Sequence, residues 1–203
     1  MREKKVPGDK IKVVHIGLPH LDRLTRLTPE KPPASDKIIF CYRGSGSYHK
    51  GLKFFLEAVT LLPEHVLARC GFIVRGIKHR AAFEPYRKKI PGLVIHSVYS
   101  VDDLPRFAGE YDVGVVPHLW RENSPLVLLE HLACGKPVLA ARLGGVVDHV
   151  REKENGWFFE SGDAGDLRQK IRMIVEGELP LPTFAMTPTA GCERFMRSLE
   201  DFS

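Results

Sequence analysis

The sequence has few cysteines, and none of them stands in a metal-binding or redox motif. The four, Cys41, Cys70, Cys134 and Cys192, lie far apart in 203 residues and form no CxxC pair. Three of them stand in apolar surroundings, which is typical of reduced core thiols rather than of zinc ligands or disulfides. We therefore expect no metal site and no disulfide framework.

Long apolar runs are also missing. No stretch reaches the roughly 18 apolar residues of a membrane-spanning helix, and the basic start MREKKVPGDK is not followed by the apolar segment of a secretory signal. We therefore expect a cytoplasmic protein. The formal net charge of +5 is compatible with anionic ligands and with peripheral association at a membrane surface. Nucleic acid is not expected as a partner, because the chain has no RNP-like aromatic motif, zinc-finger pattern or Arg-rich arm.

What the sequence does have is a regular alternation of apolar strands and amphipathic helices. Near-continuous apolar runs predict buried parallel strands, and the runs of helical spacing between them predict covering helices. The expected fold class is therefore α/β: a Rossmann-like open parallel sheet with helices on both faces. Strands are expected at 12–16, 37–42, 71–76, 93–97, 112–117, 137–141 and 156–160. Helices are expected at 52–62, 80–89, 102–109, 125–133, 163–175 and 193–202, with another after the glycine turn at 144–145.

Proline-rich segments mark the two ends of this domain. Residues 23–36 contain three prolines and are expected to form a linker, and residues 178–190 are a Pro-rich connection. We therefore divide the chain into an N-terminal strand and linker segment (1–36), a ligand-binding α/β domain (37–177), and a C-terminal connection with a helix (178–203).

The stretch 119–140, LWRENSPLVLLEHLACGKPVLA, concentrates the features of a ligand site. Ser124 is expected to cap a helix whose first turn opens with Pro125, since proline lacks the amide that would have no intrahelical partner there. The free amides of Leu126 and Val127 should then point out of the helix start. Together with the helix dipole, they favour an anion at this place.

Two acids frame the start of this helix. Glu122 precedes it, and Glu130 places a carboxylate in its apolar run, where a bare charge is costly unless it is hydrogen-bonded. A ligand with a phosphate at the helix start and hydroxyls for both acids would satisfy these features, as a nucleoside diphosphate sugar does. From the residues alone, a buried ion pair between Glu130 and a nearby Arg or Lys is the simpler alternative.

A glycine loop, RGSGSYHKG, follows the strand expected at 37–42. It matches neither G-x-G-x-x-G, because His49 stands where the third glycine is needed, nor the P-loop pattern, which requires glycine before its lysine. The loop does place Lys50 at the start of the next expected helix. Without further context, Lys50 could also be a solvated lysine.

Together, these motifs resemble the C-terminal, donor-binding lobe of the family 4 retaining glycosyltransferases (glycosyl transferases group 1), which have the GT-B fold. Glu122 and Glu130 match the family's Glu-x7-Glu motif, in the subtype that reads E-N-S-P-L-V. Gly144 and Gly145 resemble the family's G-G-x-x-E/D-x-V turn. The resemblance covers roughly residues 11–176.

The glycine loop also resembles the family's G-x-x-x-x-x-K-G pattern. Gly44, Lys50 and Gly51 match it, and the family's lysine meets the donor diphosphate. Many members carry arginine just after the first glycine. Here that position is Ser45, and Arg43 precedes the glycine.

The resemblance implies transfer of a glycosyl unit, with retention, from a UDP- or GDP-linked sugar to a saccharide or lipid-linked acceptor. Lys50 would stabilise the charge on the departing diphosphate, and Glu122 would contact the sugar, so these two are the implied catalytic residues. Val98 and Tyr99 would line the base pocket, although Tyr99 could equally well only pack. No metal or other cofactor is implied. The implied nucleotide-sugar-binding residues are Gly44, Ser45, Lys50, Val98, Tyr99, Glu122, Asn123, Ser124, Leu126, Val127 and Glu130.

The segment that resembles the junction between the two lobes begins near residue 11. We therefore expect the acceptor-binding lobe to be missing, and the isolated chain to bind donor with negligible transfer. Two alternatives stay open: a nucleotide-sugar-binding module without catalysis, and another GT-B-like enzyme such as a nucleotide-sugar epimerase.

Overall fold

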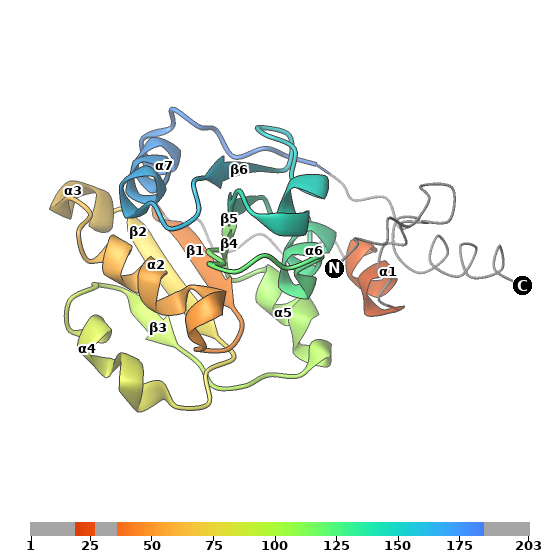
Figure 1. Ribbon diagram of the computed structural model, residues 1–203, viewed down its shortest axis with the longest axis horizontal. Helices are drawn as coiled ribbons and strands as arrows, with labels where there is room; N and C mark the ends of the chain where they lie inside the picture. The colour runs from red at the N-terminus through yellow and green to blue at the C-terminus, as the bar shows by residue number, and fades with distance from the viewer. Residues whose placement is uncertain (1–18, 27–35, 185–203) are drawn as a thin grey trace, which may run out of the picture.

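The computed structural model describes residues 19–26 and 36–184, and within them six parallel strands form one sheet in the order β3-β2-β1-β4-β5-β6 (Figure 1). The expected Rossmann-like parallel sheet is confirmed. The near-continuous apolar composition of these strands suits burial on both faces. The strands are β1 (Ile38–Arg43), β2 (Cys70–Arg75), β3 (Leu93–Ile95), β4 (Val113–Val116), β5 (Val138–Ala141) and β6 (Gly156–Phe159).

Helices cover both faces of the sheet. The α-helices are α1 (Pro19–Thr25), α2 (Leu52–Val59), α3 (Glu64–Leu67), α4 (Glu84–Arg87), α5 (Leu104–Ala108), α6 (Leu126–Ala133) and α7 (Ala164–Glu176). The 3-10 helices are η2 (Tyr48–Lys50), η3 (Arg80–Phe83), η4 (Val101–Asp103) and η5 (Gly144–Asp148). Helices α2 and α7 pack in the large core cluster on one face, whereas α1, α5 and α6 pack in smaller clusters on the other.

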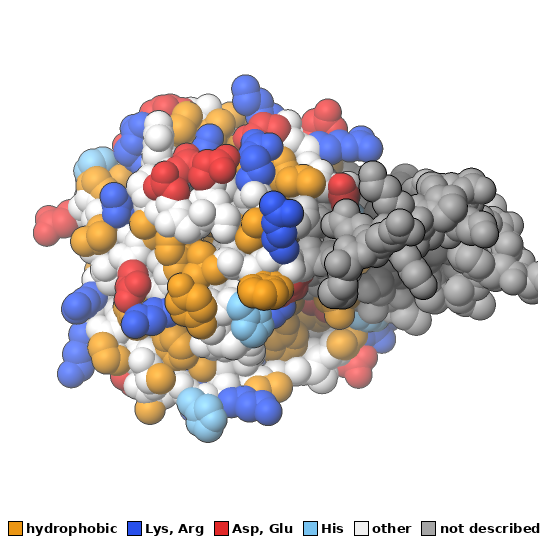
Figure 2. All heavy atoms as spheres, in the orientation of Figure 1, with side chains coloured by type: hydrophobic (Ala, Val, Ile, Leu, Met, Phe, Trp, Pro, Cys, Tyr) orange, Lys and Arg blue, Asp and Glu red, His pale blue; other side chains and the backbone are white. Residues whose placement is uncertain are grey.

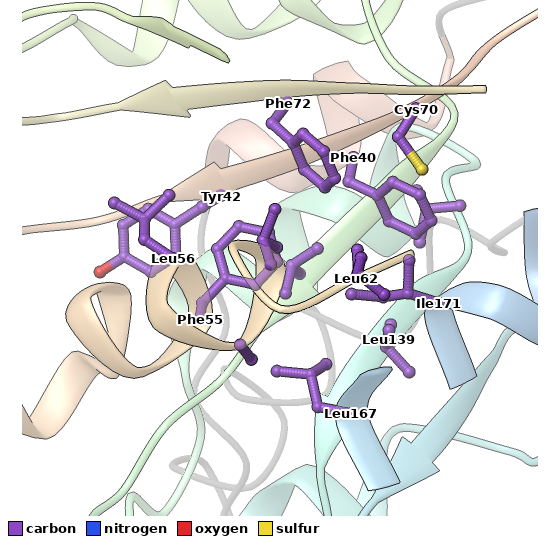
Figure 3. Close-up of a cluster of buried hydrophobic side chains, with 14 of the residues drawn as sticks. Phe40, Tyr42, Phe55, Leu56, Leu62, Cys70, Phe72, Leu139, Leu167 and Ile171 are labelled. Carbon is purple, nitrogen blue, oxygen red and sulfur yellow. The ribbon is translucent and has the colours of Figure 1, made fainter. Parts of the chain in front are cut away.

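The large cluster forms because side chains alternate along each strand. Phe40 of β1 stacks on Phe72 of β2, with ring centroids 5.8 Å apart, and Phe55 of α2 meets Phe72 edge-on at 6.0 Å (Figure 3). The alternate β1 residues Cys41 and Arg43 are buried but lie outside this cluster.

Three of the four cysteines lie in the described part of the chain. Cys41, Cys70 and Cys134 are buried and free, as expected for reduced thiols, and burial raises the pKa of the Cys41 thiol to about 12. Cys192 lies outside the described residues, as do the strand expected at 12–16 and the helix expected at 193–202. No described helix is long and apolar enough to cross a membrane.

Two expectations about local structure were wrong. Residues 80–89 do not form one helix; they form η3 followed by α4, because Pro85 lacks the amide hydrogen that a continuous helix would need there. Helix α1 lies where no helix was expected, and its last residues overlap the linker expected at 23–36. The short α1 is held by packing against α6 rather than by its own sequence.

The strand order fixes where a ligand is expected. Chain connections run outward in opposite directions from β1 and β4, which lie side by side in the middle of the sheet. In open α/β sheets, ligands bind outside the carboxyl ends of the strands at this topological switch point. The loops after β1 and β4 are residues 44–51 and 117–125, the two loops singled out from the sequence.

Candidate functional site

The loops that follow β1 and β4 lie in contact with each other. The amide of Leu119 donates a hydrogen bond to the carbonyl of His49 at 2.9 Å. Gly51 has φ +73°, and a Cβ atom at this position would lie 1.7 Å from the carbonyl oxygen of Pro117. Only glycine combines this backbone conformation with so close an approach. Gly51 therefore allows the two loops to bring their polar side chains together.

The two residues expected to be catalytic form an ion pair. Lys50 Nζ donates a hydrogen bond to Glu122 Oε1 at 2.5 Å. Their side chains are 28% and 21% exposed, so a solute can still reach both. The charges come from loops 72 residues apart in the chain, which argues against an isolated solvated lysine. The pair gives the site one cation and one acceptor for hydroxyl groups.

His118 belongs to the same cluster, although it was not singled out from the sequence. It is 2% exposed, and its Nδ1 lies 3.6 Å from Glu122 Oε1 without a hydrogen-bond partner in the described part of the chain. Burial lowers the pKa of His118 to about 4; the Glu122 carboxylate opposes this shift and Lys50 adds to it. His118 is therefore neutral at neutral pH. Its place at the end of the strand expected at 112–117, just before Glu122, was the available signal.

The double glycine at 144–145 supports the Glu122 loop. The amide of Gly145 donates to the carbonyl of Glu122 at 2.8 Å. A Cβ atom on Gly145 would lie 1.6 Å from the carbonyl oxygen of Asn123, and one on Gly144 would lie 2.5 Å from that of Glu122. This turn therefore holds the backbone of the Glu122 loop in place.

The start of α6 differs from expectation in its cap. Pro125, not Ser124, is the N-cap residue; its carbonyl accepts from the amide of Leu128 at 3.0 Å, and no side chain caps the helix. The hydroxyl of Ser124 instead hydrogen-bonds with the His149 ring at 3.2 Å. The amides of Leu126 and Val127 have no acceptor among the described residues. The expected pair of free amides at the helix start is therefore present.

Glu130 is buried and has two basic neighbours. It is 7% exposed; Oε1 lies 3.2 Å from His20 Nε2, and Oε2 lies 3.5 Å from Arg43 Nη1. The ion pair regarded as the simpler alternative is therefore present. No hydrogen bond or ion pair joins Glu130 to Lys50 or Glu122 in the described part of the chain.

Arg43 is directed toward α6 rather than toward the glycine loop. It is 1% exposed, and besides Glu130 it contacts the ring of His131, with Nε 3.5 Å from Nε2. Burial and the neighbouring Arg43 hold the pKa of His131 well below its ordinary value, so this ring is neutral. Its Nδ1 lies 2.7 Å from the hydroxyl of Tyr111. Arg43 therefore holds the carboxylate of α6 instead of projecting toward a phosphate.

The remaining expected site residues have less specific surroundings. Tyr99 packs edge-on against Phe107, with ring centroids 5.5 Å apart, which agrees with the alternative that Tyr99 only packs. Val98 is 58% exposed. The Ser45 hydroxyl lies 2.6 Å from that of Ser47. Gly44 adopts φ +145° at the start of the loop.

The described residues offer no metal-binding cluster, and the face of the molecule in Figure 2 shows no single large charged patch. Among residues 19–26 and 36–184, no three His, Cys, Asp or Glu side chains are grouped so that they could hold a metal ion. On the face shown in Figure 2, basic and acidic side chains are interspersed. The net charge is therefore not gathered into one basic surface there.

The chain is similar to known proteins in sequence and in fold. A family model described as "Glycosyl transferases group 1" matches residues 25–184. The chain is 30% identical over 162 residues to sulfoquinovosyl transferase SQD2 of Arabidopsis thaliana. That alignment covers 75% of this chain and 28% of the plant protein. The chain is 25% identical over 131 residues to N,N'-diacetylbacillosaminyl-diphospho-undecaprenol alpha-1,3-N-acetylgalactosaminyltransferase of Campylobacter jejuni. That alignment covers 64% of this chain and 34% of the bacterial protein.

Among solved structures, the fold matches Anabaena Alr3699/HepE in complex with UDP. The TM-score is 0.72 at 19% sequence identity, and the match covers 94% of this chain and 57% of that one. In sequence, the chain spans about a third of the length of the two curated relatives named above.

Proposed function

We propose a donor-binding function on one premise: this chain belongs to the glycosyl transferases group 1 family. In the proposal it is the C-terminal lobe of a family 4 retaining glycosyltransferase and binds a nucleoside diphosphate sugar between the ends of β1 and β4. The observation that carries the proposal is the contact of Lys50 with Glu122 at the topological switch point. A cation and an acceptor for hydroxyls at this position suit a diphosphate next to a sugar.

The diphosphate would take the place of Glu122 as the main partner of Lys50. A charge-assisted contact with a phosphate oxygen is stronger than a neutral hydrogen bond, and the free amides of Leu126 and Val127 would donate to the same anion. As the glycosyl bond breaks, negative charge grows on the departing diphosphate. Lys50 would then stabilise the transition state more than the ground state, which is what lowers the barrier.

Glu122, once released from Lys50, would accept hydrogen bonds from the sugar hydroxyls. The neutral ring of His118, 3.6 Å from Glu122 Oε1, would keep that carboxylate in place without adding a competing charge. Glu130 would accept from the ribose hydroxyls while it keeps its basic neighbours, Arg43 and His20.

The identity of the donor and of the acceptor is part of the proposal. A UDP-linked donor is favoured, because the similar Anabaena protein has been solved with UDP and with UDP-glucose; a GDP-linked donor is the alternative. The name of the Campylobacter jejuni relative describes an acceptor carried on undecaprenol diphosphate, which supports a saccharide or lipid-linked acceptor here as well.

Calorimetric titration with UDP, GDP and ADP, each free and as its glucose conjugate, tests the binding function. We expect one of the three bases to bind, and uridine or guanosine alone to bind much more weakly, because they lack the diphosphate. If none of the six ligands bound the folded chain, the proposal would be refuted.

Transfer is a separate outcome. Lys50 and Glu122 are partly exposed in the described structure, so water is not excluded from the reacting bond. We therefore expect the 203-residue chain alone to bind donor with negligible transfer to a panel of sugar and lipid-linked acceptors. Sustained formation of glycosylated product by the purified chain would contradict this expectation.

A further inference from the structure

Helix α1 packs beside the helix that carries Glu130. Its Leu21 and Leu24 are 4% and 1% exposed, in a cluster with Phe107 of α5 and Leu129 of α6. In Figure 1, α1 lies next to α5 and α6 at the right of the described structure. This packing brings His20 to Glu130, which is 110 positions away in the chain.

The two oxygens of the Glu130 carboxylate have different surroundings. Oε2 is closed to solvent, lies 3.5 Å from Arg43 Nη1, and has no hydrogen-bond partner among the described residues. Oε1 lies 3.2 Å from His20 Nε2. Because an ionised carboxylate only accepts, that nitrogen carries the hydrogen and donates it. A ribose hydroxyl could therefore reach this carboxylate only at Oε1, the oxygen that His20 already contacts.

We propose that His20 is a positioning residue for the nucleotide: α1 is a strap, residues 19–25, that holds Glu130 Oε1 in place for the ribose hydroxyls. This inference rests on the proposed function, since it takes Glu130 as the ribose acceptor. A carboxylate oxygen has two lone pairs, so Oε1 accepts from His20 and from a hydroxyl at the same time.

The strap lowers the cost of binding. With His20 on one oxygen and Arg43 near the other, the carboxylate is already held in one orientation, so the nucleotide does not have to order it. Binding of the nucleotide and docking of α1 then strengthen each other by the same factor, because coupling between two equilibria is reciprocal.

The test compares ligands with and without ribose hydroxyls in calorimetric titrations of the full 203-residue chain. The probes are UDP and GDP, each with its 2′,3′-dideoxy analogue. His20→Leu removes the donor and places a side chain of good helical propensity there, whereas His20→Gln keeps an N–H that can reach Oε1. We expect His20→Leu to lower the affinity for the nucleotide about three- to tenfold, which corresponds to the loss of one hydrogen bond. His20→Gln should restore most of that affinity. The dideoxy analogue should show almost no difference among these variants.

His65→Leu is the matched control. His65 contacts Glu176 in the same way, with Nε2 3.3 Å from Oε1, but on the exposed surface between α3 and α7. This variant should leave all affinities unchanged. Leu24→Ala should lower the affinity for UDP or GDP as His20→Leu does, because it removes the packing that docks α1. The double variant should be no weaker than the worse single one, since both changes act on one element.

The outcomes separate this inference from the proposed function. Wild-type binding with unchanged or tighter binding by His20→Leu would overturn the inference alone. Equal losses for the nucleotide and its dideoxy analogue would also overturn it, because the effect would not pass through the ribose. If the wild-type chain bound no nucleoside diphosphate, the proposed function would fail and this inference with it.

Discussion

Glu130→Ala should reduce stability as well as nucleotide affinity, because Arg43 would lose its counter-charge. Arg43 is 1% exposed, and its Nη1 lies 3.5 Å from Glu130 Oε2. Two unit charges at that separation attract by about 5 kcal/mol at an effective dielectric constant of about 20. Measured losses on breaking one side of a buried pair are about 3 to 5 kcal/mol. We expect the free energy of unfolding, measured by urea titration and circular dichroism, to fall by that amount.

Glu84→Ala is the matched control for this experiment. It removes an exposed ion pair, Glu84 with Arg87 at 3.2 Å, and should cost less than about 1 kcal/mol. Replacing both buried partners, with Arg43→Met and Glu130→Leu together, should recover much of the stability lost in Glu130→Ala, since no unpaired charge is left. If Glu130→Ala cost no more than Glu84→Ala, the buried charge pair would not have the role assigned to it.

Two further predictions concern the Glu122 cluster. Glu122→Ala should lower the affinity for the nucleotide sugar. The affinity for the free nucleoside diphosphate should stay unchanged or rise slightly, because Lys50 loses a competing partner. Equal losses of affinity for both ligands in calorimetry would contradict this. The pKa of His118 is lowered from 6.5 to about 4 by burial, so the unfolded chain takes up the proton first as the pH falls. Wild-type stability should therefore drop between about pH 6.5 and pH 4, by up to about 3 kcal/mol from this group, and His118→Gln should remove that part of the slope. Identical pH dependence of urea unfolding in both proteins would contradict the buried neutral histidine.

The strands could be predicted because each carries its own signal, whereas their order in the sheet depends on tertiary packing and came only from the structure. An apolar run such as VGVV or VLAA needs burial on both faces, which a parallel sheet covered by helices provides. The sequence placed Lys50 and Glu122 after two strands, but their contact also requires these strands to be neighbours, which the structure shows. What linked them, the close approach of Gly51 to Pro117, is a tertiary contact.

Pro85 is a local cause of the error at 80–89, but two other errors came from contacts between distant residues. Ser124 has the composition of a helix cap, but its hydroxyl is taken by His149, 25 positions later. Helix α1 is too short to be stable by propensity and depends on Leu21 and Leu24 packing against other helices. His118 was missed although Glu122 lies only four residues later, because a lone histidine at a strand end forms no motif of its own.

The most direct test of the account is the affinity of Lys50→Ala for a free nucleoside diphosphate. Lys53→Ala is the matched control, because Lys53 is an exposed lysine of α2, 3.7 Å from Glu57. We expect Lys50→Ala to weaken UDP or GDP binding by about ten- to a hundredfold, as for a charged hydrogen bond. The corresponding nucleoside should bind as before, and Lys53→Ala should match the wild type for both ligands. Unchanged diphosphate affinity in a folded Lys50→Ala protein would contradict the assignment of this sheet edge as the donor site.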